Sequence, residues 1–235
     1  MDTNEDLVQR VKTYTMPPEA QQLLADNPPL FLCGITASGK NTLINKLVSK
    51  GGYELVVSHT TRQPRMNHDA LELNGVDYFF VNESEVLNLV KYNKFIEVKK
   101  VHNKFYGTSI DAYKAPVSRQ NNPVLDIDVQ GAEEFAKAVP ALRPIFLLPP
   151  NFEVWQERLN GRGKLDESEL AVRYKSALME IPRALDNTAF QLLINDDKST
   201  SAVVIEHGDI GRSGDAIGVA HDLIANIKWQ LDRHK

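Results

Sequence analysis

The most informative stretch of the chain for its fold is Leu30-Phe-Leu-Cys-Gly-Ile-Thr-Ala-Ser-Gly-Lys-Asn-Thr-Leu43. An apolar run breaks into a loop of small residues between Gly34 and Gly39, and a helical pattern starts directly after it. A strand, a glycine loop and a helix in this order cradle phosphate, because main-chain N–H groups and the positive helix end surround the anion. A plain glycine turn is the alternative, and the lysine that follows Gly39 argues against it.

The start of this helix also suggests a metal site. Lys40 would place a point charge on the terminal phosphates of a nucleotide. The next position commonly offers a hydroxyl to Mg²⁺, but here it is Asn41, with Thr42 one place later. Because an amide oxygen also ligates Mg²⁺, a metal site at Asn41 stays a prediction.

Length and composition indicate a globular protein. The 235 residues are 42% hydrophobic, which is enough for one substantial core with small inserted lobes. No apolar run approaches a membrane span and the opening residues do not resemble a signal peptide, so we expect a cytoplasmic protein with no membrane partner. The net charge of −4 argues against a dedicated nucleic-acid binder. The single cysteine, Cys33, is expected to be a small buried residue.

Residues 1–28 precede the first predicted strand and look like an extension. Leu7, Val11 and Tyr14 would share one face of a helix, and a second short helix is expected from Glu19 to Ala25. We assign no chemistry to this segment.

A second informative stretch is Ser58-His-Thr-Thr-Arg-Gln-Pro-Arg65. Two arginines three positions apart, with a proline that prevents a helix, suit a doubly charged phosphate, because each guanidinium can make two parallel bonds. Taken alone, a solvated basic loop is the commoner explanation.

Further motifs follow in order: Gly75-x-Asp-Tyr-x-Phe-Val81, Phe95-Ile-Glu97, Tyr106-Gly-Thr108, Leu125-Asp-Ile-Asp-x-Gln-Gly131, Gly161-Arg-Gly163 and Ile194-Asn-Asp-Asp197. Together with the two stretches above, they resemble the guanylate kinase family over about residues 30–197. The resemblance implies the α/β P-loop fold of nucleoside-monophosphate kinases, with a central parallel sheet flanked by helices. The expected parts are an extension (1–28), a core (29–57, 109–156 and 178–235), a small mixed β/α GMP-binding lobe (58–108) and a helical lid (157–177).

The resemblance assigns Glu97 to reading guanine, with Ser58 and Thr108 as hydroxyl partners and Asp128 as a further nucleotide contact. A carboxylate accepts from both N1–H and the exocyclic amine of guanine, whereas the bare N1 of adenine would repel it. The simpler alternative for Glu97 is an exposed strand position paired with Lys99 or Lys100. The clamp for the GMP phosphate would comprise Arg62, Arg65, Tyr78 and Tyr106.

For ATP, the resemblance implies contacts from Gly34, Thr36, Ala37, Ser38, Gly39, Lys40, Asn41, Thr42, Arg158 and Asn195. The catalytic cations would be Lys40, Arg62, Arg162 and Arg173, the last two on the lid, where glycines allow movement. Surface pairing of the lid arginines with the acids of 166–169 is the alternative. Asp126 would organise the waters of Mg²⁺. Asp126 and Asp128 are two positions apart on a predicted strand, so their side chains would share one face. They would lie at the carboxyl end of the strand, where ligands of parallel α/β sheets bind.

Two segments depart from the family. The loop from Met66 to Glu72 is about four residues longer than expected, and residues 198–215 form an insertion without an assigned role. A closing amphipathic helix is expected from about Ala216 to Leu231.

The sequence therefore predicts an ATP:GMP phosphotransferase that uses Mg²⁺, acting as a monomer or homodimer. Two alternatives stay open: a sugar-phosphate kinase on the same fold, and a scaffold domain that binds phosphorylated peptides. The intact Gly39-Lys40 pair disfavours the scaffold, and the set of Ser58, Glu97 and Thr108 disfavours the sugar phosphate.

Overall fold

The computed structural model describes residues 3–67, 70–101, 103–161, 165–196, 211 and 213–233. The chain forms two compact units. Unit 1 comprises Met1–Pro29 and Gly52–Pro123, and unit 2 comprises Leu30–Gly51 and Val124–Lys235. The N-terminal segment therefore belongs to the same unit as the predicted GMP-binding lobe, together with residues 109–123, which the sequence had placed in the core.

Unit 2 is built on parallel strands in the order β11-β10-β1-β9. Their bounds are β1 (Leu30–Gly34), β9 (Asn122–Asp126, of which the last three residues belong to this unit), β10 (Ile145–Leu148) and β11 (Gln191–Ile194). All four residues of β10 are buried, as expected for a central strand covered on both faces. Cys33 on β1 is fully buried, and its thiol donates to the Ile145 carbonyl at 3.4 Å.

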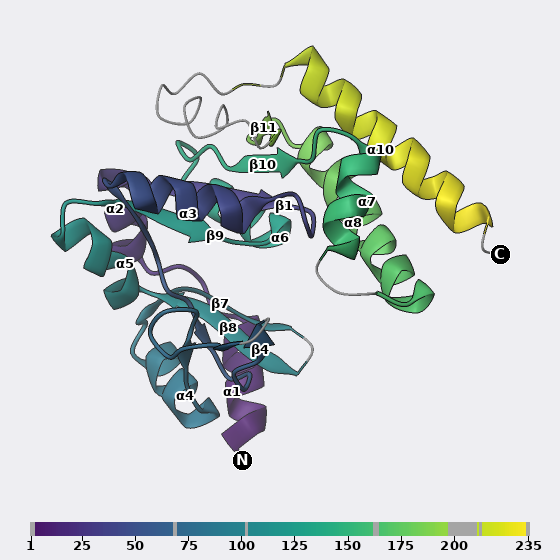
Figure 1. The fold of residues 1–235 in the computed structure, drawn as a ribbon. Coiled ribbons are helices and arrows are strands. Elements are labelled where there is room, and N and C mark those ends of the chain that lie inside the picture. Colours follow the sequence, from purple (N-terminus) through teal and green to yellow (C-terminus); the bar gives the residue numbers. More distant parts are fainter. Residues whose placement is uncertain are drawn as a thin grey trace. The chain divides into compact units, whose positions relative to one another are not determined.

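Five helices flank this sheet in the described part of unit 2 (Figure 1): α3 (Lys40–Lys50), α6 (Val129–Ala138), α7 (Phe152–Asn160), α8 (Glu167–Asp186) and α10 (Gly214–Arg233). Side-chain caps fix where several of them begin. Asn151 accepts from Val154 N, and Asp166 and Glu169 form a reciprocal capping box at the start of α8. The last helix, α10, packs along α8, as Figure 1 also shows.

One strand prediction is wrong. Asp126 and Asp128 do not share a strand face, because β9 ends at Asp126 and Asp128 caps the following helix. The Asp128 carboxylate accepts from Gly131 N at 2.7 Å, so local capping determines its position.

Unit 1 contains a four-stranded mixed sheet in the order β6-β3-β8-β7. Its strands are β3 (His59–Thr60), β6 (Phe79–Phe80), β7 (Phe95–Val101) and β8 (Lys104–Ser109). A small hairpin joins β4 (Met66–Asn67) to β5 (Ala70–Leu71), and β2 (Tyr53–Leu55) is a further short strand. The helices are α1 (Thr3–Lys12), α2 (Pro18–Asp26), α4 (Glu83–Lys91) and α5 (Ile110–Ser118).

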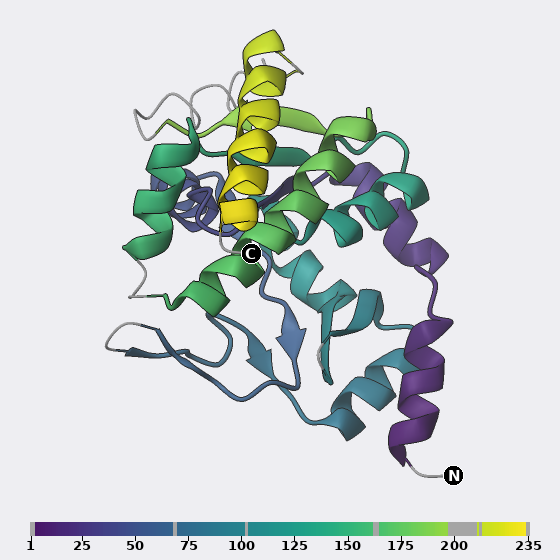
Figure 2. The ribbon, with the colours of Figure 1, turned by 90° about the vertical axis from the view of Figure 1, so that its right-hand side faces the viewer.

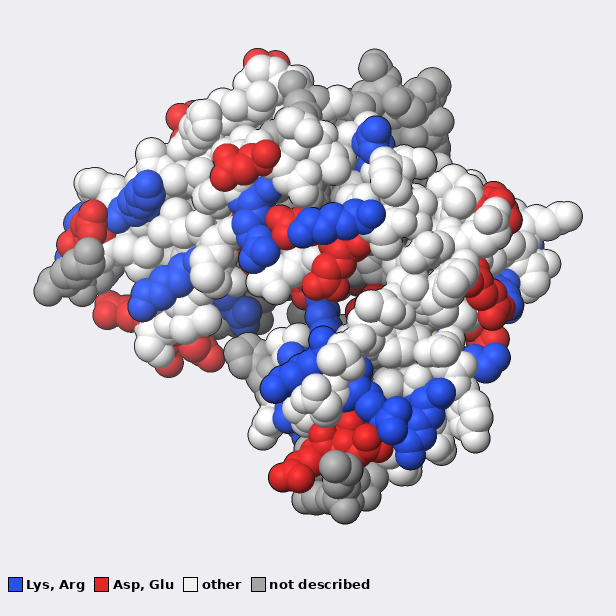
Figure 3. Space-filling view, turned by 180° about the vertical axis from the view of Figure 1, so that it is seen from behind, with Lys and Arg blue, Asp and Glu red and all other residues white. Residues whose placement is uncertain are grey.

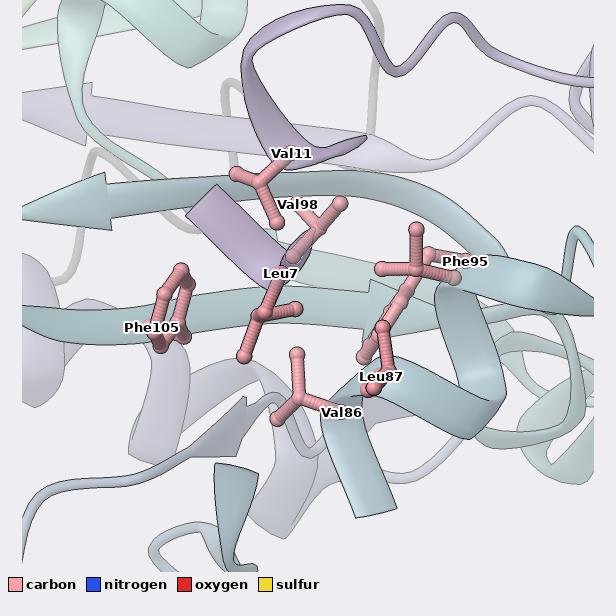
Figure 4. Close-up of a cluster of buried hydrophobic side chains, with 8 residues drawn as sticks. Leu7, Val11, Val86, Leu87, Phe95, Val98 and Phe105 are labelled. Carbon is pink, nitrogen blue, oxygen red and sulfur yellow. The ribbon is translucent and has the colours of Figure 1, made fainter. Parts of the chain in front are cut away.

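The N-terminal helix is part of the core of unit 1. Leu7 and Val11 of α1 are buried in one cluster with residues of α4, β7 and β8 (Figure 4). The views of Figures 1 and 2 both show α1 beside α4, in agreement with their contacts. Further along the segment, Asn27 O accepts from the Tyr113 hydroxyl and Glu19 pairs with Lys114 of α5 at 2.7 Å. The segment that the sequence presented as an extension thus completes this unit.

Charges of both signs are mixed on the surface. On the face drawn in Figure 3, Lys and Arg lie next to Asp and Glu rather than in a region of their own. Among the described residues, no helix is both long and apolar enough to cross a membrane.

Candidate active site

The main chain shapes the phosphate loop of unit 2. The loop leaves β1 at Gly34 and enters α3 at Gly39, which has a φ of +90° and a ψ of +15°. A Cβ at position 39 would lie 2.3 Å from Asn195 Nδ2, so both the backbone and the neighbouring side chain require glycine. The turn is therefore built for close approach to the main chain.

Three side chains from outside the loop donate hydrogen bonds to its main-chain carbonyl groups. Trp155 Nε1 donates to Thr36 O at 2.7 Å. Asn195 Nδ2 and Arg158 Nη1 donate to Ser38 O at 2.9 and 3.2 Å, and Arg158 also donates to Asn195 O at 3.0 Å. The first N–H groups of α3 have no partner within the helix, so the loop and the helix start together offer donors to an anion.

Arg158 and Asn195 were predicted to contact ATP, and the structure brings both against the loop that would bind its phosphates. Their hydrogen bonds support the loop backbone. Trp155 has the same role and was not predicted, since a buried tryptophan in a helix reads as core. Ser38 Oγ is buried and has no hydrogen-bond partner among the described residues, so it is available to a bound phosphate.

Lys40 forms an ion pair inside this site. Its Nζ lies 2.6 Å from Asp126 Oδ1, at the carboxyl end of β9. Burial lowers the pKa of the Lys40 ammonium, but the Asp126 carboxylate more than offsets this effect, so its pKa is raised and the side chain stays charged. The ion pair with Asp126 therefore holds the Lys40 ammonium group at the carboxyl end of β9.

The remaining predicted residues of unit 2 stand as follows. Asn41 and Thr42 are exposed in the first turn of α3, close in sequence to the Lys40–Asp126 pair. Arg173 is exposed on α8, and no hydrogen bond or ion pair with the described residues holds it at the loop. Arg162 lies outside the described residues. Asp128 belongs to unit 2, whereas the other predicted GMP-binding residues belong to unit 1.

In unit 1, the three residues predicted to read guanine lie together. Thr108 Oγ1 donates to Glu97 Oε1 at 3.0 Å, and Ser58 Oγ lies 3.3 Å from Thr108 Oγ1. Glu97 faces Thr108 directly across the antiparallel β7–β8 pair. Glu97 therefore has a hydroxyl partner on the neighbouring strand, whatever contacts it also makes with the lysines beside it on β7.

Three of the four residues predicted for the phosphate clamp lie together in unit 1. The Arg62 guanidinium lies over the rings of Tyr78 and Phe80, at 5.2 and 5.8 Å from their centroids, and also interacts with Tyr106. The Tyr78 and Tyr106 rings are 6.3 Å apart in an edge contact. The Arg65 side chain is exposed beside this cluster in sequence, without an ion pair among the described residues.

Glu72 is the residue of the clamp that sequence reasoning missed. Both of its oxygens accept from Arg62, at 2.6 and 2.9 Å, and one of them also accepts from Arg65 N at 2.7 Å. The Arg62 hydrogen bond lowers the pKa of Glu72 below its usual value. The available signal was that the loop after the two arginines carries two acids, Asp69 and Glu72, but the loop was noted only for its length.

Comparison with known proteins identifies the family of this chain. The family model described as guanylate kinase matches residues 26–205. The chain belongs to the guanylate kinase family. The guanylate kinase of Saccharophagus degradans is 36% identical over 167 residues, which cover 71% of this chain and 78% of that protein. The guanylate kinase of Neisseria meningitidis serogroup A is 36% identical over 179 residues, covering 75% and 84%.

Guanylate kinase 1 of Oryza sativa is 37% identical over 174 residues, which cover 72% of this chain and 44% of that longer protein. The crystal structure of guanylate kinase from Anaplasma phagocytophilum matches with a TM-score of 0.55 and 27% identity, covering 77% of this chain and 84% of that one. The family and the fold class inferred from the sequence are thereby confirmed. Helix α1 lies before the start of the match to the guanylate kinase model.

Proposed function

We propose that this protein transfers the γ-phosphoryl group of ATP to GMP, giving ADP and GDP. The hydrogen-bonded set of Ser58, Thr108 and Glu97 carries the proposal, because it gives the acceptor site a specificity for guanine. Membership of the guanylate kinase family supports the same conclusion.

ATP binds at the phosphate loop in this proposal. The main-chain N–H groups and the start of α3 receive the phosphates, and Lys40 neutralises charge on the terminal ones. Arg158 and Asn195 act by keeping the loop in shape, in addition to any contact with the nucleotide. Ser38 Oγ supplies a further donor.

The residues at the helix start fit a magnesium ion. Mg²⁺ prefers oxygen ligands and is commonly held by one or two carboxylates together with the phosphates of the substrate. Asp126, which is about one-third exposed at 37%, and the oxygens of Asn41 and Thr42 provide such donors. When bound, the ion would neutralise charge on the β- and γ-phosphates.

GMP binds in unit 1 with its base against Glu97. The carboxylate accepts from N1–H and the exocyclic amine, while the Ser58 hydroxyl donates to O6. Since Thr108 already donates to Glu97, the carboxylate is oriented before the base arrives. Adenine offers no N–H at N1, so its N1 lone pair would face the half-buried carboxylate without a hydrogen bond, which is costly.

The GMP phosphate binds to the arginine cluster. Arg65, Tyr78 and Tyr106 supply donors around Arg62, which Glu72 and the aromatic rings hold in place. One phosphate oxygen of GMP attacks the γ-phosphorus of ATP as the bond from that phosphorus to the bridging oxygen breaks. The electron pair leaves with ADP, and no covalent enzyme intermediate is needed.

Catalysis is then positioning and charge stabilisation. Lys40 and Arg62 each form an ion pair within the described structure. Arg162 and Arg173, on the lid, are proposed to act on the phosphates together with them. The charge on the transferring phosphoryl group is spread over its oxygens, so several cations each stabilise a part of it.

An acceptor screen with GMP, AMP, UMP and ribose phosphates tests the proposal. We expect ADP release with GMP far above that with the other acceptors. Strong activity with a ribose phosphate would indicate the sugar-phosphate kinase, and no ATP binding by calorimetry with or without Mg²⁺ would indicate the scaffold.

Glu97→Gln sharpens the screen, because glutamine keeps the shape but replaces one acceptor oxygen by a donor. We expect the preference for GMP over AMP to fall by about tenfold or more. Glu134→Gln, an exposed acid on α6, is the matched control and should leave the preference unchanged. An unchanged preference in Glu97→Gln would mean that another residue reads the base.

A further inference from the structure

Strand β7 carries an irregularity next to the base-reading carboxylate. Phe95 pairs with Ser109 and Glu97 pairs with Thr108, so two steps along β7 correspond to one step along β8. Such a bulge bends the strand and changes the direction of its side chains. The direction of Glu97 therefore depends on how this bulge is held.

Tyr14 holds the bulge from the N-terminal segment. Its hydroxyl donates to Phe95 O at 2.7 Å, across 81 positions of sequence. Burial raises the pKa of this hydroxyl, so it remains a protonated donor at neutral pH. The ring of Tyr14 is partly buried against the hydrophobic cluster of unit 1, which restricts its movement.

The same segment covers the back of the reading strands. Side chains alternate across a strand, so Val98 and Phe105 lie on the face opposite to Glu97 and Thr108. Leu7 and Val11 of α1 pack against this back face, as the close-up in Figure 4 shows. One face of the β7–β8 pair thus reads the ligand while the other rests on α1 and α4.

The two strands also have little room to adjust. A Cβ at Gly107 would lie 2.7 Å from Glu97 O and 3.0 Å from the Phe95 ring. A shift of the Phe95 peptide would therefore be transmitted to the main chain at Glu97 instead of being absorbed by a gap.

We infer that residues 3–14 form a brace for the base-reading strand and that Tyr14 is a positioning residue for Glu97. The brace lies outside the part of the chain that matches the family model. The inference rests on the proposed function for the identity of the ligand, because it takes Glu97 as the group that recognises the base of GMP.

The test compares Tyr14→Phe with Tyr92→Phe. The first variant removes only the hydroxyl and keeps the ring, so the hydrophobic cluster stays filled. Tyr92, at the end of α4, is 74% exposed, and its hydroxyl makes no hydrogen bond with the described residues, which makes it a matched control in the same unit.

Two measurements are made on each full-length protein. Amide hydrogen exchange without nucleotide should become faster at residues 95–98 in Tyr14→Phe, with α4 unchanged. In steady-state kinetics, the KM for GMP should rise about three- to tenfold, as expected for one lost hydrogen bond, while the KM for ATP and kcat stay within about twofold. Tyr92→Phe should match the parent in both measurements.

The outcomes separate the inference from the proposed function. Faster exchange at β7 together with a raised KM for GMP supports the brace and its role. Unchanged exchange overturns the brace, and faster exchange with an unchanged KM overturns the positioning role. Failure of the proposed function would show in the parent protein itself, as absent turnover of GMP, and exchange at β7 would then decide the brace alone.

Discussion

The two candidate sites are built in different ways. At the phosphate loop, Trp155, Arg158 and Asn195 all donate to main-chain carbonyls. In the sheet of unit 1, the site consists of contacts between side chains, from Ser58 through Thr108 to Glu97 and from Arg62 to Glu72. The first site presents backbone to its ligand, and the second presents functional groups.

The two sites should therefore respond differently to substitution. A backbone site tolerates most side-chain substitutions but is sensitive where glycine is required or where a cation such as Lys40 contacts the phosphates. A site made of side chains distributes its function, so each substitution removes a part of affinity or specificity.

Lys40→Ala should have the largest effect. We expect kcat to fall by about 10²–10³-fold, because the variant loses a charge that stabilises the transferring phosphoryl group. Stability should change by about 1 kcal/mol or less, since the Asp126 carboxylate left behind is partly exposed to water. A coupled assay of ADP release and thermal unfolding measure the two effects.

Lys137→Ala, an exposed lysine on α6, is the control for Lys40→Ala and should behave like the parent. Near-normal turnover in Lys40→Ala would remove this residue from the mechanism.

Gly39→Ala and Gly51→Ala compare the two ends of α3. Both glycines have positive φ, +90° and +86°, so each alanine should cost about 1–3 kcal/mol of stability from backbone strain. Only position 39 also meets a side chain, Asn195, whereas nothing lies within 4 Å of a Cβ at position 51. We therefore expect Gly39→Ala to weaken ATP binding about tenfold or more, and Gly51→Ala to leave it unchanged.

Calorimetric titration with ATP and thermal unfolding separate these effects. Equal ATP affinities in the two variants would show that the shape of the loop is not what binds phosphate.

Glu72→Gln should have the smallest effect of the three. The variant loses the charge that accepts two bonds from Arg62, and we expect about 1–2 kcal/mol less stability at neutral pH. Because the folded-state pKa of Glu72 is lowered, its contribution is complete above the unfolded-state pKa of about 4.3 and is lost as pH falls through the folded value.

The difference in unfolding free energy between the parent and Glu72→Gln should therefore be constant from pH 7 to about 5 and shrink toward pH 3. Urea unfolding at several pH values measures it, with Glu134→Gln as the control that shows no difference. A gap that widens on acidification would contradict the assigned direction of the pKa shift.

Features coded by neighbouring residues were predicted well. The phosphate loop, β1 and the start of α3 follow from fourteen consecutive residues. Helix α4 runs from Glu83 to Lys91 and begins at a capping box formed by Asn82 and Glu85, which lie only three positions apart.

Features that depend on distant or competing contacts were not predicted from the sequence. Alternation along a strand favoured placing Asp128 with Asp126, but a cap within three residues decided its position. The partner of Arg62 lies across an irregular loop, and the Tyr14 hydroxyl meets a carbonyl 81 positions away. The pattern of Leu7 and Val11 predicted an apolar helix face but not the surface that it covers.

The burial of Cys33 has a practical consequence. Because it is the chain's single cysteine and burial raises the pKa of its thiol, little thiolate exists at neutral pH to attack a maleimide or an aromatic disulfide. Its labelling rate would therefore report how often β1 separates from β10, with and without a nucleotide on the loop above. A cysteine introduced on the surface for a fluorescent probe would be modified first, without replacing the native one.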